Sequence, residues 1–180
     1  MTTLRPTIEA LIRLFQAQVT QQTVLVPSDT PFEIKRTPSM IIQGPQLKEN
    51  TPRRSQSPII TSNLPELTFT SCKPPRLYHL DFDLILTTAT EPDLLDYQEK
   101  ITAFFQHNLT LAIPNLGSLN LTERKPMGSL RRVNHSNLRQ SAGRCRIEDC
   151  PIFGSPIQQG KLIKHRTFQF PGTGHPQRTY

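Results

Sequence analysis

Residues 78–105 constrain the fold of this chain more than any other stretch, because they combine a long alternating strand with a capped helix. Apolar side chains recur at every second position, as in a strand with one buried face, at Tyr78, Leu80, Phe82, Leu84 and Leu86. Thr90 to Asp93 have the composition of a helix start. An apolar stripe follows at Leu94, Tyr97, Ile101, Phe104 and Phe105. The stretch therefore predicts a folding core of sheet and helix.

Weaker patterns on both sides of this core add a second helix and several strands. Apolar residues at helical spacing predict a helix over 4–22, and 23–37 reads as a loop or short extended pieces. Alternation and turn residues predict strands over 39–43, 67–71, 109–113, 118–121, 144–150 and 162–170. The predicted fold class is α+β, with two helices packed on a single antiparallel sheet, a mixed sheet being left open.

Proline-rich segments interrupt these elements. The chain has 17 prolines among 180 residues, about twice the average share. We expect one domain over 1–180 with long irregular arms at about 44–66 and 122–140 and a flexible C-terminal tail at 171–180. General disorder is the alternative, but apolar runs such as 80–86 and 109–121 are too hydrophobic to remain solvated.

The positive charge of the chain lies in its last third. The net charge is +7, made up of −1 over 1–121 and +8 over 122–180. Such a one-sided distribution favours a polyanion or an acidic protein surface as partner, while a solvated basic surface is the plain alternative. Few aromatic residues interleave with the basic ones, which disfavours a stacking platform for single strands. The candidate contact residues, for a partner or for DNA, are Arg131, Arg132, Arg139, Arg144 and Arg146.

Catalytic and metal-binding patterns are weak. His79, Asp81 and Asp83 share the polar face of the predicted strand and could hold a divalent metal, but polar residues are expected in any case on the solvent-facing side of a half-covered sheet, and this spacing is permissive. Pro92-Asp93 begins like a nuclease core, yet the acidic-x-Lys element that should follow is missing, since Glu99-Lys100 has the wrong spacing. We therefore expect no catalytic residue, no metal site and no cofactor.

The cysteines read as structural thiols. The chain has an odd number of cysteines, namely Cys72, Cys145 and Cys150, and its N-terminus lacks the apolar region of a signal peptide. Together these two features favour reduced thiols in a cytosol. Cys145 and Cys150 with His165 are a possible zinc set, but positions five apart on a strand are expected to point to opposite faces. No apolar run approaches the length of a membrane span.

The order of the short motifs resembles a family of phage tail proteins. The motifs are PSMIIQGP at 38–45, YHLDFDLI at 78–85, LLDYQEK at 94–100, RCRIEDCP at 144–151 and GKLI at 160–163. This order, after an N-terminal helix, resembles the tail terminator or neck proteins of contractile-tailed bacteriophages and Mu-like prophages, over about 4–170. The resemblance identifies no site residue.

The resemblance implies a small α+β core that assembles as a hexameric ring closing the tail tube. It implies a virion structural protein of the tail and neck, assembled in the host cytoplasm, with tube, sheath and neck or connector proteins as partners. The ring would encircle the DNA path, so the basic residues could make non-specific DNA contacts in its lumen. Two alternatives stay open: another neck or baseplate adaptor, and a small basic nucleic-acid-binding or nuclease-like protein.

Overall fold

The computed structural model describes residues 3–27, 34, 36–55, 57–129, 137–154 and 158–161. The chain divides into two compact units. Unit 1 combines Met1–Ser55 with Pro75–Gly154, and unit 2 combines Gln56–Pro74 with Ser155–Tyr180. Within the described ranges, no helix has the length and apolar character needed to cross a membrane.

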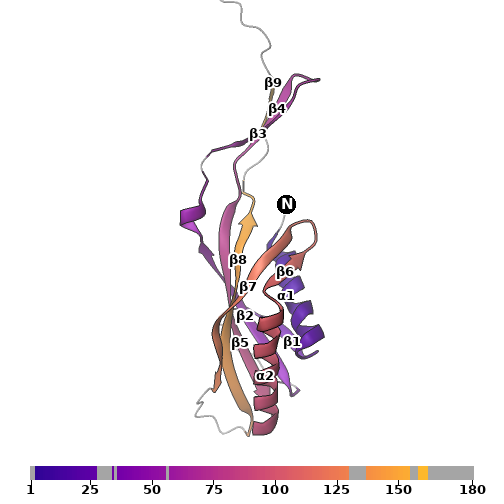
Figure 1. Cartoon of the computed structure of the whole chain (residues 1–180), viewed down its shortest axis with the longest axis vertical. Coiled ribbons are helices and arrows are strands. Elements are labelled where there is room, and N and C mark those ends of the chain that lie inside the picture. Colours follow the sequence, from indigo (N-terminus) through magenta and orange to yellow (C-terminus); the bar gives the residue numbers. More distant parts are fainter. Residues whose placement is uncertain are drawn as a thin grey trace, which may run out of the picture. The chain divides into compact units, whose positions relative to one another are not determined.

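Unit 1 is built on a six-stranded mixed sheet (Figure 1). In spatial order the strands are β1 (Thr23–Val26), β2 (Ser39–Glu49), β5 (Arg76–Thr88), β8 (Arg139–Ile152), β7 (Gly117–Ser129) and β6 (Thr110–Ile113). All neighbouring strands are antiparallel except β1 and β2, which are parallel. The strand predicted over 78–86 is confirmed and lies at the centre of this sheet as part of β5.

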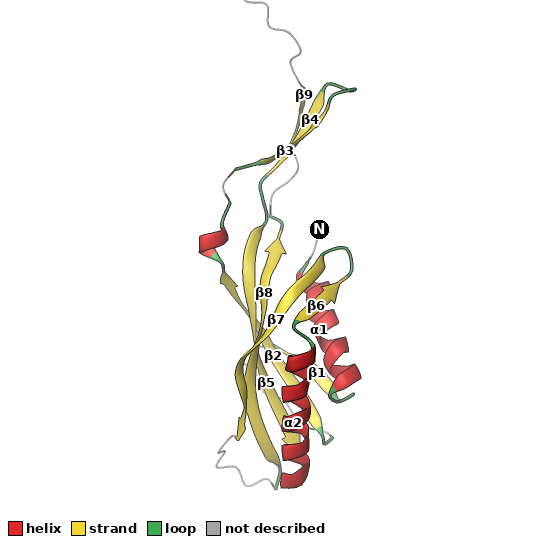
Figure 2. Cartoon of the chain, in the orientation of Figure 1, coloured by secondary structure: helices red, strands yellow, loops and turns green. Residues whose placement is uncertain are grey.

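Two helices, α1 (Leu4–Gln18) and α2 (Glu91–His107), cover one face of the sheet (Figure 2). The Thr90 side chain accepts a hydrogen bond from the Asp93 backbone N–H, which caps α2 as the sequence predicts. The alternating side chains of β5, Leu80, Phe82, Leu84 and Leu86, are buried in one core with Leu11 and Phe15 of α1 and Leu94, Ile101 and Phe104 of α2.

Aromatic and polar contacts fix the two helices to each other and α1 to the sheet. The rings of Phe15 and Phe104 stack with centroids 4.4 Å apart, and the Lys100 ammonium donates to the Val19 carbonyl at 2.9 Å. At the other end of α1, the Thr3 hydroxyl donates to the Pro151 carbonyl at 2.6 Å. These contacts join α1 to α2 and to β8.

Unit 2 contains a separate three-stranded antiparallel sheet. Its order is β3 (Ile59–Asn63), β4 (Thr68–Cys72) and β9 (Gln158–Lys161). Among the described residues of this unit, none is buried. Gly160 of β9 packs closely against Phe69 of β4: an added Cβ would lie 2.4 Å from the Phe69 ring, so a side chain at position 160 would require the ring to move.

The α+β class is confirmed, but the expectation of a single antiparallel sheet is wrong. The described residues form two sheets, and the larger one is mixed, the alternative left open, because β1 and β2 pair in parallel. Residues 23–26 lie in the segment expected as a loop or short extended pieces, and they form the four-residue strand β1, which is too short for a strong alternation signal. The strand expected at 67–71 as an edge is β4, the centre of the small sheet.

Parts of the segments expected as irregular arms are regular strand. Residues 44–49 continue β2 and 122–129 continue β7, while a short 3₁₀ turn, η1 (Thr51–Arg53), follows β2. Gly44 and Pro45 lie within β2 and do not end it. The register between β2 and β5 shifts between Gln43 and Gln46, and proline is tolerated at such a bulge. The strand predicted over 162–170 and the tail at 171–180 lie outside the described residues.

The expectation that Cys145 and Cys150 point to opposite faces is also wrong. Both are fully buried, and Cys150 contacts the Thr7 hydroxyl of α1 at 3.8 Å. The register between β5 and β8 shifts between Tyr78 and Leu80, and Asp149 has a positive φ of 56°. The extra residue of this bulge reverses the alternation, so that both thiols face the helices.

Candidate functional site

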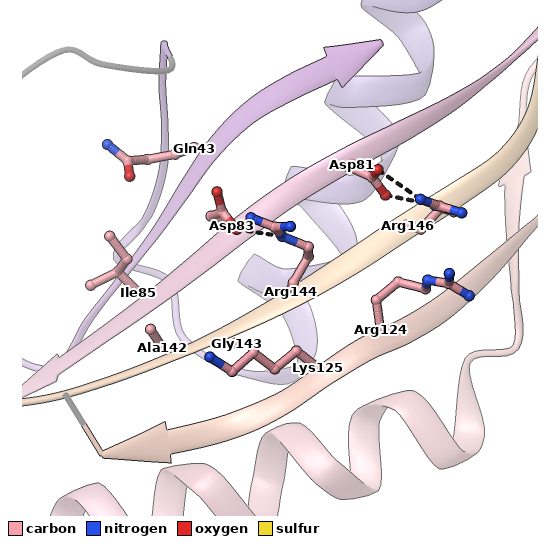
Figure 3. Close-up of a pocket in the computed structure, with 10 residues that line it drawn as sticks. All are labelled: Gln43, Asp81, Asp83, Ile85, Arg124, Lys125, Ala142, Gly143, Arg144 and Arg146. Atoms are coloured by element: carbon pink, nitrogen blue, oxygen red, sulfur yellow. Dashed lines mark hydrogen bonds and ion pairs between the residues drawn. The ribbon is translucent and has the colours of Figure 1, made fainter. Parts of the chain in front are cut away.

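The face of the six-stranded sheet opposite the helices carries ordered rows of charged side chains (Figure 3). Strand pairing places Asp83 of β5 beside Arg144 of β8, and Arg144 in turn beside Lys125 of β7. The next row places Asp81 beside Arg146. Because they are two residues apart on β8, Arg144 and Arg146 share this face.

The two acid–base pairs differ in geometry and burial. Arg146 binds Asp81 through two bonds, Nε to Oδ1 at 2.6 Å and Nη2 to Oδ2 at 2.8 Å, and both side chains are about 15% exposed, at 15% and 14%. Arg144 binds Asp83 through Nε alone, at 2.7 Å, and its side chain is 46% exposed. Arg146 and Asp81 therefore form a structural pair, whereas both terminal nitrogens of Arg144 have no partner among the described residues and can donate to a ligand.

The electrostatics follow this geometry. The hydrogen bonds from Arg146 hold the pKa of Asp81 below its usual range, against the opposing effect of burial, and the charges of Arg146, Arg144 and Arg124 add to the lowering. In return, the carboxylates of Asp81 and Asp83 raise the pKa of the guanidinium each one binds. Asp81, Arg144 and Arg146 are therefore charged at neutral pH.

A shallow open groove of about 530 Å³ runs along this face. Its charged lining consists of four cations and two carboxylates, contributed by Asp81, Asp83, Arg124, Lys125, Arg144 and Arg146. Over the described part of the chain, neither Arg124 nor Lys125 takes part in an ion pair. The groove therefore has an excess of positive charge on β7 and suits a ligand that bears carboxylates or phosphates.

The structure brings together only part of the predicted contact set. Arg139, at the start of β8, pairs with Glu91 of α2 at 3.4 Å, apart from the groove lining. Arg131 and Arg132 lie outside the described residues. Sequence reasoning missed the pairing of Asp81 and Asp83 with the arginines, since it depends on the register of strands about sixty residues apart.

His79, Asp81 and Asp83 do not form a common ligand set. His79 lies at the β8 bulge, where its Nδ1 accepts from the Asp149 backbone N–H at 3.4 Å, while the two aspartates face the arginines. The Asp149 carboxylate is bound by Asn50 and Arg53 of the η1 segment. In the described ranges, no group of three or more His, Cys, Asp or Glu side chains is arranged to hold a metal ion.

Together, the fold and this face define an α+β protein whose open sheet surface carries a charged groove. No known protein family matches the sequence, and no curated protein matches it either. Among solved structures, the chain is similar to the sheath/tube terminator of an extracellular contractile injection system, PVC, in its extended state. The TM-score is 0.61 at 12% sequence identity.

The structural match covers 99% of this chain and 66% of the terminator chain, so this protein spans slightly less than two thirds of the length of that protein. At this level of identity the match concerns the fold. The resemblance to terminators of contractile tails, expected from the order of the sequence motifs, is thereby confirmed for the fold.

Proposed function

We propose that this protein is a tail terminator, a non-enzymatic structural subunit that forms a ring at the end of a contractile tail. The observation that carries the proposal is the match of nearly the whole chain, across both units, to a sheath/tube terminator. In this role the ring caps the tube and sheath and joins them to the neck, and the protein resides in the virion tail after assembly in the host cytoplasm. A hexamer is the expected ring.

The composition of the surface supports assembly with other subunits. The described residues of unit 2 form a sheet with no buried side chain, although three strands need a hydrophobic face to be stable alone. Ile59, Ile60 and Leu64 are at least half exposed there. Burial of such residues between copies, or against tube and sheath proteins, would stabilise the small sheet.

The basic last third has a second expected role within such a ring. Arg131, Arg132, Arg139, Arg144 and Arg146 are proposed to contact a partner subunit or the DNA in the lumen. Charge reversal by Arg131→Glu with Arg132→Glu tests the lumen role. Unchanged DNA retention in particles carrying this variant would count against it, whereas DNA loss with intact assembly would support it.

The experiment that tests the proposed function is the solution mass of the purified chain, by light scattering on a sizing column at low and high salt. We expect a hexamer-sized species that survives high salt, and labelling of this protein at the tail end in assembled particles. Steep, salt-dependent DNA binding by a chain that remains monomeric or dimeric, also in the presence of tail tubes, would contradict it and favour a nucleic-acid-binding protein.

A further inference from the structure

Unit 1 carries opposite charges on its two outer sides. The open sheet face presents Arg124, Lys125 and Arg144, all exposed, which we call the basic strip. The helix layer presents the solvent side of α2, where Leu95, Asp96 and Glu99 are exposed, and we call these residues the acidic helix face. Because α2 packs on the Leu80 and Phe82 side of the sheet, the two surfaces point in opposite directions.

The cations of the basic strip lie close together, and two of them, Arg124 and Lys125, have no ion-pair partner among the described residues, whereas Arg144 is paired with Asp83. Lys125 lies directly beside Arg144 in the strand register, and Arg124 occupies the register shift next to it. Asp83 engages only the Nε of Arg144, which orients the guanidinium and leaves its two terminal nitrogens free of partners among the described groups. Ile85 and Ala142 give the same groove an apolar part. The strip is thus a pre-oriented set of donors for carboxylates.

The carboxylates of the acidic helix face also have no ion-pair partner among the described residues. Glu91 is paired with Arg139 and Asp93 contacts the capping Thr90, but Asp96 and Glu99 form no ion pair within the described part of the chain. Three residues apart on a helix, they lie on one side of it. Leu95, beside them, is 59% exposed and provides an apolar contact. This combination of acidic and apolar side chains complements the strip.

We propose that the basic strip of one copy binds the acidic helix face of the next copy in a ring. This inference rests on the proposed function and names the surfaces through which its subunits meet. A contact between the back of one subunit and the front of the next is heterologous, and such contacts close into rings when the rotation between subunits allows it. DNA would account for the basic strip alone, whereas a second copy satisfies both surfaces. Arg144 therefore contacts a partner subunit.

Charge reversal with restoration tests this contact. The strip variant carries Arg124→Glu and Lys125→Glu, and the helix variant carries Asp96→Lys and Glu99→Lys. Each should weaken assembly about tenfold or more, because like charges then face each other. The chain with all four substitutions should assemble again, and so should an equimolar mixture of the two variants as an alternating ring. Arg13→Glu, an exposed charge reversal on α1, is the matched control and should assemble normally.

A second readout reports the contact even where the ring dissociates during sizing. Carbodiimide joins a lysine amine to a carboxylate in contact with loss of water, so Lys125 should cross-link to Asp96 or Glu99. Mixing light and ¹⁵N-labelled chains identifies the cross-links that join two copies. Circular dichroism of every variant confirms that it is folded. Between-copy cross-links from Lys125 to the acidic helix face would support the contact.

The outcomes separate this contact from the proposed function. Assembly that is unaffected by both reversals overturns the contact but leaves a ring-forming terminator in place. Loss of DNA binding by the strip variant, with assembly intact, assigns the strip to DNA and overturns the contact. A wild-type chain that neither assembles nor cross-links from Lys125, at high concentration and on tail tubes, overturns both.

Discussion

Arg146 clamps Asp81 with two hydrogen bonds, 2.6 Å and 2.8 Å long, across adjacent central strands of the large sheet. Both side chains are mostly buried, so that removing one partner leaves the other charge without compensation. We expect Asp81→Asn to lower the free energy of unfolding at neutral pH by about 2 kcal/mol. Urea unfolding followed by circular dichroism measures this difference.

The pH dependence of the same variant gives an independent check. Because Arg146 lowers the pKa of Asp81 in the folded protein, the pair stabilises the fold above the ordinary pKa of an aspartate, about 3.9. This contribution is lost as the pH falls from there through the lowered folded pKa. The stability difference between wild type and Asp81→Asn should therefore shrink below pH 4. Asp83→Asn, in the more exposed pair, is the control and should lose less, about 0.5 kcal/mol.

Glu123 of β7 is expected to affect stability with the opposite pH dependence to that of Asp81. Its Oε1 is buried without a hydrogen-bond partner among the described groups, and burial raises the pKa of this carboxyl. The folded state thus holds the proton more tightly than the unfolded state. Ionised Glu123 therefore lowers the free energy of unfolding, and the loss grows as the pH rises through the pKa of this carboxyl in the unfolded state and then through its pKa in the folded state. Glu123→Gln should raise the melting temperature at pH 7, with the gain disappearing in acid. Glu99→Gln, on the solvent side of α2, should give no such gain.

The largest loss of stability from a single truncation is expected at the Phe15–Phe104 stack. Both rings are buried at the junction of α1 and α2, and Phe105 meets both edge-on. Phe104→Ala removes the stack and leaves a cavity, so unfolding should become easier by about 3–5 kcal/mol. Thr102→Ala, on the exposed side of the same helix, should change the stability by less than about 0.5 kcal/mol. Equal effects of the two variants in thermal unfolding would argue against the helix packing.

Thiol reactivity tests the placement of the three cysteines. Cys145 and Cys150 are fully buried, and burial raises the pKa of both thiols, whereas Cys72 is partly exposed on β4 of unit 2. A thiol reagent such as Ellman's should modify one cysteine per native chain rapidly and three in denaturant. Cys72→Ser should abolish the fast phase. Rapid modification of two or three thiols in the native protein would be inconsistent with the packing of β8 against α1.

The elements with strong local signals could be predicted from the residues alone. The alternation over 78–86 and the helix after Thr90 are such signals, because a buried strand face and a capped amphipathic helix each follow from residues close together in the chain. The shared face of Arg144 and Arg146 follows equally from two-residue spacing. The α+β class and the likeness to tail terminators rest on the order of these elements.

The pairing of strands far apart in the chain could not be predicted from local patterns. The ion pairs of Asp81 and Asp83 depend on the register between β5 and β8, and the common face of Cys145 and Cys150 depends on a bulge that no local pattern marks. The small sheet joins β4 to β9, some ninety residues away, so its existence is a non-local property. Strand periodicity says which side chains share a face, but the partner across the strand is set by packing of the whole chain.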